Sequence, residues 1–183
     1  MEKHVVFGFV VVCLAGTAVC KLGSPGGPMK LHRDSPDGFR TMEQFAYAVA
    51  ISDSDNDTIF ECLAAKRLGI DPETHTGTYE FSLPSSGRTL LFYVRPGDSP
   101  GTMTMTSDID SNPKEGIIYY TDYKDCVVAD LELEGEGHQC TLWTRARVKN
   151  NVPQNCIDQF VDVCGVVVPA HSRDLCADAD DDD

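Results

Sequence analysis

Apolar and polar residues alternate along most of the chain between residues 45 and 148. In "FAYAVAI" the residues Phe45, Tyr47, Val49 and Ile51 recur at every second position, and similar runs follow with turn residues between them. This period is typical of β-strands, because successive strand side chains point to opposite faces of a sheet. The pattern predicts eight strands, over residues 45–51, 58–68, 77–83, 89–94, 102–106, 116–123, 126–134 and 138–148.

The gaps between the predicted strands are mostly short and carry turn residues, as in "LPSSG", "RPGDSPG" and "GEG". Strands joined by hairpin-sized turns favour an antiparallel meander or a barrel. Two helices are also predicted, over residues 37–44 and 153–163. The second has Pro153 in its first turn, an apolar face and Gly165 at its end. The sequence therefore indicates an all-β domain with a short C-terminal helix.

Residues 1–20 differ in kind from the rest of the chain. A charged start precedes an apolar run over residues 5–14, and small residues follow, which is typical of a secretory signal peptide. The run is too short to cross a bilayer, since a spanning helix needs about 20 apolar residues. We expect a secreted, extracellular protein without membrane insertion, cleaved after Cys20, with cleavage after Ala18 as the alternative.

The remaining chain divides by composition. Residues 21–36 are dense in Gly, Pro and Ser and predict an irregular N-terminal lead, whereas residues 37–176 form one domain, expected to be a monomer. Residues 177–183, "ADADDDD", predict a disordered acidic tail. Removal of residues 1–20 takes one acid and one base, so the net charge stays at −14. Nucleic acid is excluded as a partner, because binding to phosphates requires a basic surface.

Eight cysteines occur in the chain, and six remain after residues 1–20 are removed. An even number behind a secretory signal predicts disulfides, although about 15 connectivities are possible and the spacing does not choose among them. Zinc does not fit, because no C-x-x-C pair is present and the histidines are scattered. We expect no metal and no cofactor. The motifs of serine hydrolases, zinc proteases and phosphate-binding loops are absent too, so an enzyme is not expected.

Several motifs resemble those of tick salivary lipocalins, the family that includes histamine-binding proteins. In the C-terminal half these are "YYTDYKDCVV", "CTLW", "NVPQNC" and "DLC", and earlier "ISDSDNDTIFECL" and "GTYEFSL" are similar. The resemblance covers about residues 37–176. It implies an eight-stranded antiparallel lipocalin barrel with the C-terminal helix packed outside. It also implies the disulfides Cys62–Cys176, Cys126–Cys156 and Cys140–Cys164. The family often has an acidic residue after the cysteine of "C-x-L-W", where this chain has Thr141.

If the paired cysteines point outward to the helix, strand alternation decides which side chains point inward. The residues then expected inside are Val127, Ala129, Leu131, Leu133, Thr141, Trp143, Arg145, Ile59, Glu61, Leu63 and Ala65. Glu80 is a further candidate if it shares the inward face of Thr78. A β-bulge would invert any assignment beyond it.

The resemblance implies capture of a small host mediator, with a biogenic amine such as histamine or serotonin as the leading ligand. An amine requires a desolvated carboxylate and an aromatic ring, and the candidate ligand residues are Tyr47, Glu61, Glu80, Trp143 and Arg145. For Trp143 the alternative is packing at the floor of the barrel. For Arg145 it is a structural stack across Phe39 or Phe45 at the closed end.

Two other functions remain open from the sequence. The apolar lining and Thr141 favour a lipid guest, such as a leukotriene, a fatty acid or a sterol. Alternatively, the barrel is a scaffold whose loops bind a host immune protein. In either case, Asn56-Asp57-Thr58 is an acceptor sequon that predicts N-glycosylation at Asn56.

Overall fold

The computed structural model describes residues 35–54, 60–133, 137–165, 168–171 and 176. The expected signal peptide, most of the N-terminal lead, the acidic tail, Ile59 and Asn56 lie outside these residues. The described elements are α1 (Gly38–Gln44), β1 (Tyr47–Asp53), β2 (Ala64–Asp71), β3 (Thr76–Leu83), η1 (Pro84–Ser86), β4 (Arg88–Pro96), β5 (Thr102–Ser107), β6 (Lys114–Thr121), β7 (Cys126–Leu133), β8 (Gly137–Thr144), η2 (Ala146–Val148), α2 (Gln154–Cys164) and β9 (Val168–Pro169).

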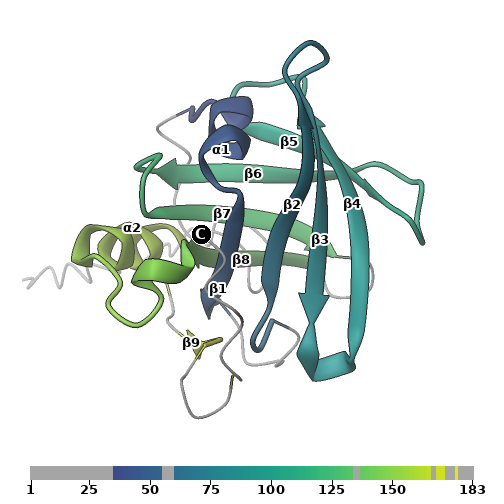
Figure 1. Ribbon diagram of the computed structural model, residues 1–183. Helices are drawn as coiled ribbons and strands as arrows, with labels where there is room; N and C mark the ends of the chain where they lie inside the picture. The colour runs from purple at the N-terminus through teal and green to yellow at the C-terminus, as the bar shows by residue number, and fades with distance from the viewer. Residues whose placement is uncertain (1–34, 55–59, 134–136, 166–167, 172–175, 177–183) are drawn as a thin grey trace, which may run out of the picture.

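Strands β1 to β8 form a closed antiparallel barrel (Figure 1). Each strand from β2 to β7 pairs with the next, β8 pairs with β1, and β1 returns to β2 through the register Tyr47↔Lys66 to Val49↔Ala64. The short strand β9 adds to the far part of β1 at Ser52 and Asp53. This lipocalin-type barrel is the architecture expected from the sequence.

The two α-helices lie at different places on the barrel. Helix α1 lies across one end, and its N-cap Asp37 accepts a hydrogen bond from the backbone N–H of Arg40 at 3.0 Å (Figure 1). Helix α2 packs on the outside of β6, β7 and β8. It ends at Gly165, whose φ of 87° is readily adopted by glycine and whose N–H bonds the carbonyl of Val161.

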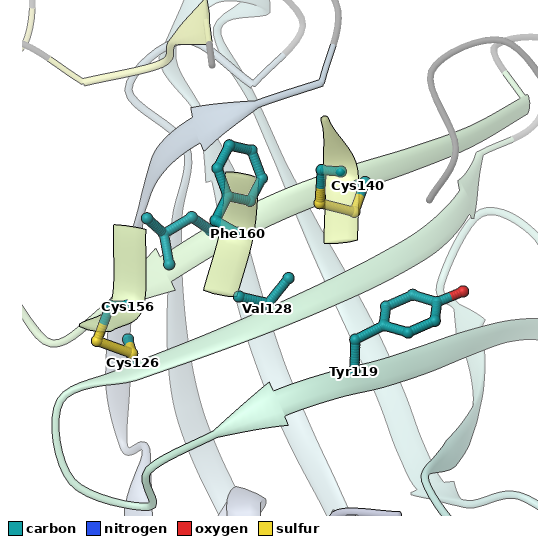
Figure 2. Close-up of a cluster of buried hydrophobic side chains, with 8 residues drawn as sticks. Tyr119, Cys126, Val128, Cys140, Cys156 and Phe160 are labelled. Carbon is teal, nitrogen blue, oxygen red and sulfur yellow. A yellow bond between two sulfur atoms is a disulfide. The ribbon is translucent and has the colours of Figure 1, made fainter. Parts of the chain in front are cut away.

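The contact between α2 and the wall is an apolar cluster held by two disulfides (Figure 2). Cys126 bonds Cys156 at the start of the helix, and Cys140 bonds Cys164 at its end. Phe160 lies between the two bonds over Val128 and is fully buried. A third disulfide, Cys62–Cys176, ties the C-terminal segment to the chain just before β2. These three pairs are the ones that the family resemblance implies.

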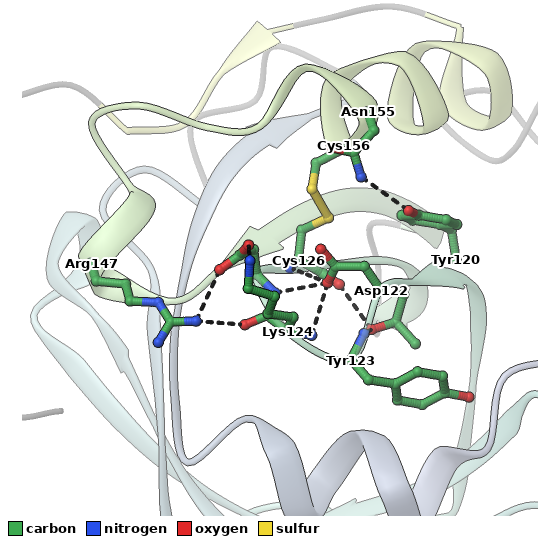
Figure 3. The surroundings of a disulfide bond; sticks show 10 residues. Tyr120, Asp122, Tyr123, Lys124, Cys126, Arg147, Asn155 and Cys156 are labelled. Atoms are coloured by element: carbon green, nitrogen blue, oxygen red, sulfur yellow. Dashed lines mark hydrogen bonds and ion pairs between the residues drawn. A yellow bond between two sulfur atoms is a disulfide. The ribbon is translucent and has the colours of Figure 1, made fainter.

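The turn between β6 and β7 fixes the first of these disulfides (Figure 3). The Asp122 carboxylate accepts three backbone hydrogen bonds, from Lys124 at 2.9 Å, Asp125 at 2.7 Å and Cys126 at 3.0 Å. Nearby, the side chain of Asn155 on α2 donates to the hydroxyl of Tyr120 at 3.2 Å. The start of α2 is therefore attached to the barrel wall by polar contacts as well as by sulfur.

Candidate functional site

An apolar cavity of about 160 Å³ lies inside the barrel, directly below α1. Its wall comes from both sides of the barrel, so the cavity exists only because the sheet closes. The residues that line it are Gly38, Thr41, Met42, Phe45, Ala48, Ala65, Tyr79, Phe81, Val94, Met103, Met105, Gly116, Ile117, Ile118, Val127, Ala129, Asp130, Leu131 and Trp143.

Methionine and aromatic side chains give this cavity its character. Met42, Met103 and Met105 belong to one buried cluster, and methionine adapts its shape to irregular gaps and packs well on aromatic rings. Helix α1 sits directly on this cluster: a Cβ at Gly38 would lie 2.2 Å from the sulfur of Met103. The lining thus offers an adaptable apolar surface to a flat guest.

The end of the cavity under α1 is closed by side chains that bind the last carbonyls of this helix. Arg67 Nη1 donates to the carbonyls of Met42 and Glu43, the latter at 3.0 Å, and the Tyr79 hydroxyl donates to Met42 at 3.2 Å. Arg145 donates to the carbonyl of Gln44. Cations at a helix C-terminus also interact favourably with the helix dipole. The closure is therefore electrostatic as well as steric.

Arg145 lies with its guanidinium 5.2 Å from the ring centroid of Phe45. This is the stack across an aromatic residue that the sequence offers as the structural alternative for Arg145. Because Arg145 holds α1 and is not among the residues that line the cavity, its position gives no support to a direct ligand contact.

Burial raises the pKa of Tyr79 to about 12, although the nearby positive charge of Arg67 lowers it in part. The folded state therefore holds this proton more tightly than an unfolded tyrosine does. Stability from this effect is complete below pH 10, the ordinary value, and is lost as the pH rises from about 10 through 12. We expect Tyr79→Phe to remove one late-ionising tyrosine from an absorbance titration and to flatten the alkaline loss of stability. A profile identical to that of the wild type would contradict this assignment.

Trp143 packs against two buried clusters of the barrel. One is the cluster around the cavity, which includes Met42 and Phe45, and the other contains Ala50, Phe60 and Leu63. Its ring lies 5.7 Å from the ring of Phe81, centroid to centroid. Trp143 is thus both a cavity wall, as predicted for a ligand residue, and a packing residue.

A row of inward positions continues from the cavity across β7, β8 and β1. Ala129 lines the cavity, lies directly opposite Thr141 on β8, and Thr141 lies directly opposite Asp53 on β1. Directly opposed residues in a sheet share a face, so Asp53 and Thr141 are inside. Both are buried, Asp53 with 4% and Thr141 with 2% of its surface exposed. An interior carboxylate therefore stands across from the position where the family often has an acid.

Asp53 is not among the residues that the sequence predicts to point inward. The pairing of β1 with β8 shifts between Ala50 and Ser52, and this bulge turns Asp53 inward. A strict alternation from Ala50 would instead place Ser52 inside. In the sequence Asp53 is visible only as an acidic residue near the end of the first predicted strand. Its direction cannot be inferred without the pairing register of β1 and β8.

Glu80 and Tyr47 do not reach the cavity, and the inward orientation considered for Glu80 is wrong. Tyr79 and Phe81 line the cavity, so Glu80 between them points outward, as Thr78 does. On β1 the inward residue is Ala48, so Tyr47 faces outward too. For Glu80 the error arises because no cysteine anchors the parity of β3. For Tyr47 it arises because Phe45 precedes β1, which starts at Tyr47, so the inward position of Phe45 does not carry over to Tyr47.

Glu61 is also not among the residues that line the cavity. The second strand starts at Ala64, and residues 60–62 form a turn in which Cys62 has a φ of 60°. Strand alternation therefore does not extend to Glu61, and its inward position stays a prediction. The inward positions of Ala65, Val127, Ala129, Leu131 and Trp143 are confirmed by the lining. Thr141 is placed inside by its register rather than by the lining, Arg145 lies against α1, and the side chain of Leu133 lies outside the described part.

The sequence profile of the family described as tick histamine binding protein matches residues 39–173. The chain belongs to this tick histamine-binding protein family. No curated protein sequence matches it. The crystal structure described as an AM182 serotonin complex aligns with a TM-score of 0.60 at 13% identity, over 80% of this chain and 96% of that chain. A structure of apocrustacyanin C1 aligns with a TM-score of 0.49 at 12% identity, over 75% and 83% of the two chains.

At such identities the likeness to solved structures concerns the fold alone. The family match is independent of it and covers the barrel and α2 together. Among the described residues of this histamine-binding family member, no helix is long and apolar enough to cross a membrane.

Proposed function

We propose that this protein sequesters a small aromatic amine inside the barrel, with the ring in the apolar cavity and the ammonium group at Asp53. The observation that carries the proposal is the inward row Ala129–Thr141–Asp53, which leads from the cavity to a buried carboxylate. Function of this kind is stoichiometric capture rather than turnover.

The size of the cavity supports a small guest. At about 160 Å³ it is close to the roughly 150 Å³ apolar cavity of an engineered protein that accepts a benzene molecule. Pockets for drug-sized ligands are larger, about 300–1,000 Å³. A single ring system with a short polar arm therefore fits better than a long acyl chain.

The chemistry of the interior supports an amine. A buried carboxylate favours an ammonium partner, and aromatic faces such as that of Trp143 attract cations by about 0.5–2 kcal/mol. The name of the family refers to histamine binding, and the AM182 structure is described as a serotonin complex. Histamine and serotonin are therefore the first ligands to test.

Replacement of Asp53 by asparagine should weaken amine binding by about 10- to 100-fold, since a hydrogen bond to a charged group contributes about 1.5–3 kcal/mol. Asparagine keeps the size of the side chain and removes its charge. Isothermal titration calorimetry with serotonin and histamine measures the change. The matched control is Glu80→Gln, which removes an outward carboxylate and should leave cavity binding unchanged.

Two outcomes would contradict the proposal. One is an absence of binding heat for the wild type at millimolar amine. The other is an unchanged affinity in Asp53→Asn, because the ammonium would then have another partner.

The second candidate is a lipid guest, favoured by the methionine-rich lining and by Thr141 in place of an acid. Native mass spectrometry of the purified protein would detect a copurified lipid, and Asp53→Asn should then leave its binding unchanged. A scaffold role toward a host immune protein remains a third proposal. If the barrel is a scaffold, substitutions inside it should leave binding of the host protein unaltered.

We further propose that the protein is secreted as a monomer, with the signal peptide cleaved after Cys20 and a glycan on Asn56. The three disulfides support an oxidising compartment, since such bonds persist outside the cytosol. Host defence evasion by removal of a mediator follows from the same proposal.

A further inference from the structure

A second hollow, of about 330 Å³, lies on the outer wall of the barrel over β1, β2 and β3. It is separate from the cavity, because its strand residues are those that point away from the interior. Its far side is formed by His171 and by the Cys62–Cys176 disulfide of the C-terminal segment. The hollow is thus bounded by the sheet on one side and by His171 and Cys176 on the other.

Six strand residues form two parallel rows across this part of the sheet. Tyr47, Lys66 and Glu80 lie directly opposite one another across β1, β2 and β3. Val49, Ala64 and Ser82 form the next outward row. The first row is aromatic and charged, and the second is small and mainly apolar.

The charged row presents one positive and one negative group next to each other. Directly opposed side chains start about 5 Å apart, so Lys66 and Glu80 can contact one small ligand together. Among the described residues neither side chain forms an ion pair or a hydrogen bond. Both groups are therefore available to a ligand.

Among the described residues that line it, the far side of the hollow adds no competing charge. Burial lowers the pKa of His171, and the positive charge of Lys149 lowers it further, so this imidazole is neutral at pH 7. The backbone there is fixed, since the N–H of Cys62 donates to the carbonyl of Ala170 at 2.9 Å. Of the described lining residues, a ligand would thus meet two with opposite charges on one side and uncharged, partly apolar ones elsewhere.

We propose that this outer hollow binds a free amino acid with an aliphatic side chain. Glu80 receives the ammonium group, Lys66 receives the carboxylate, and the side chain lies on Val49 and Ala64. A simple amine would face Lys66 without a counter-charge, and a simple carboxylate would face Glu80 in the same way. This site does not depend on the proposed cavity function.

Leucine and two analogues that each lack one charge provide the test. We expect leucine at millimolar concentration to shift the amide NMR signals of Ala64, Lys66 and Ser82 in the oxidised full chain. Isopentylamine and 4-methylpentanoate should shift them at least tenfold less at equal concentration. Equal shifts from all three compounds, or none from leucine, would overturn the proposal.

Single charge removals locate the site. Glu80→Gln and Lys66→Gln should each weaken the leucine response at least tenfold, while Glu115→Gln, an exposed carboxylate on β6, should leave it unchanged. Asp53→Asn should also leave it unchanged, which separates this site from the cavity. A leucine response that survives both Glu80→Gln and Lys66→Gln would overturn the assignment. Failure of amine binding in the cavity would not affect any of these results.

Discussion

Removal of the Cys62–Cys176 disulfide, by replacing both cysteines with alanine, should lower the free energy of unfolding by about 4–5 kcal/mol. The bond joins residues separated by 114 positions, so its loss frees a long loop in the unfolded chain. Without the bond the unfolded chain has more conformational entropy, and folding must overcome this larger entropy loss. Equilibrium unfolding in urea, monitored by the fluorescence of Trp143, measures the change.

The matched control is the pair Cys140→Ala with Cys164→Ala, which opens a separation of only 24 residues. The chain-entropy account gives this bond about 3–4 kcal/mol, so the longer loop should cost more. A smaller loss for the Cys62–Cys176 variant than for the control would show that loop length does not govern the stability contributed by these bonds.

These bonds stabilise a barrel whose interior is not completely packed. An internal cavity forfeits contacts, and each Å³ left empty costs folding free energy. Here the cavity lies under α1, while the disulfides act at the outer wall and at the C-terminal segment. Stability and ligand space are therefore supplied by different parts of the molecule, so that substitutions in one need not disturb the other.

The barrel could be predicted from the sequence because its strands carry a clear period of two and short turns. Inward and outward faces were predicted correctly on β7 and β8, where Cys126 and Cys140 fix the parity by reaching α2. The same rule does not extend to Glu61, because the chain before β2 is a turn rather than a strand. Parity holds only as far as an uninterrupted strand extends from an anchored residue.

The interior carboxylate could not be predicted, for a related reason. Asp53 points inward only after a bulge in β1, and the position of a bulge depends on the pairing with β8. The closure of the cavity was partly predictable: Arg145 was expected across Phe39 or Phe45, and it lies over Phe45. The contributions of Arg67 and Tyr79 depend on where α1 ends, which sequence patterns locate only within a few residues.

Replacement of Phe160 by alanine should destabilise the protein by about 3–5 kcal/mol, the usual cost of truncating a buried phenylalanine. Phe160 is fully buried between two disulfides, which limit how far α2 can move to fill the space (Figure 2). The adjacent Val161 is 40% exposed, so Val161→Ala should change stability by only about 0.5 kcal/mol. Urea unfolding of both variants measures the difference.

The same pair of variants tests whether α2 serves the barrel from outside without shaping the cavity. Phe160 packs on the outward cluster around Val128, whereas Val127 faces the cavity. Amine affinity at low temperature, where Phe160→Ala remains folded, should therefore equal that of the wild type. If Phe160→Ala lowers both stability and amine affinity, the packing on the outer face of β7 affects the positions of its inward side chains. The two faces of this strand would then not be independent.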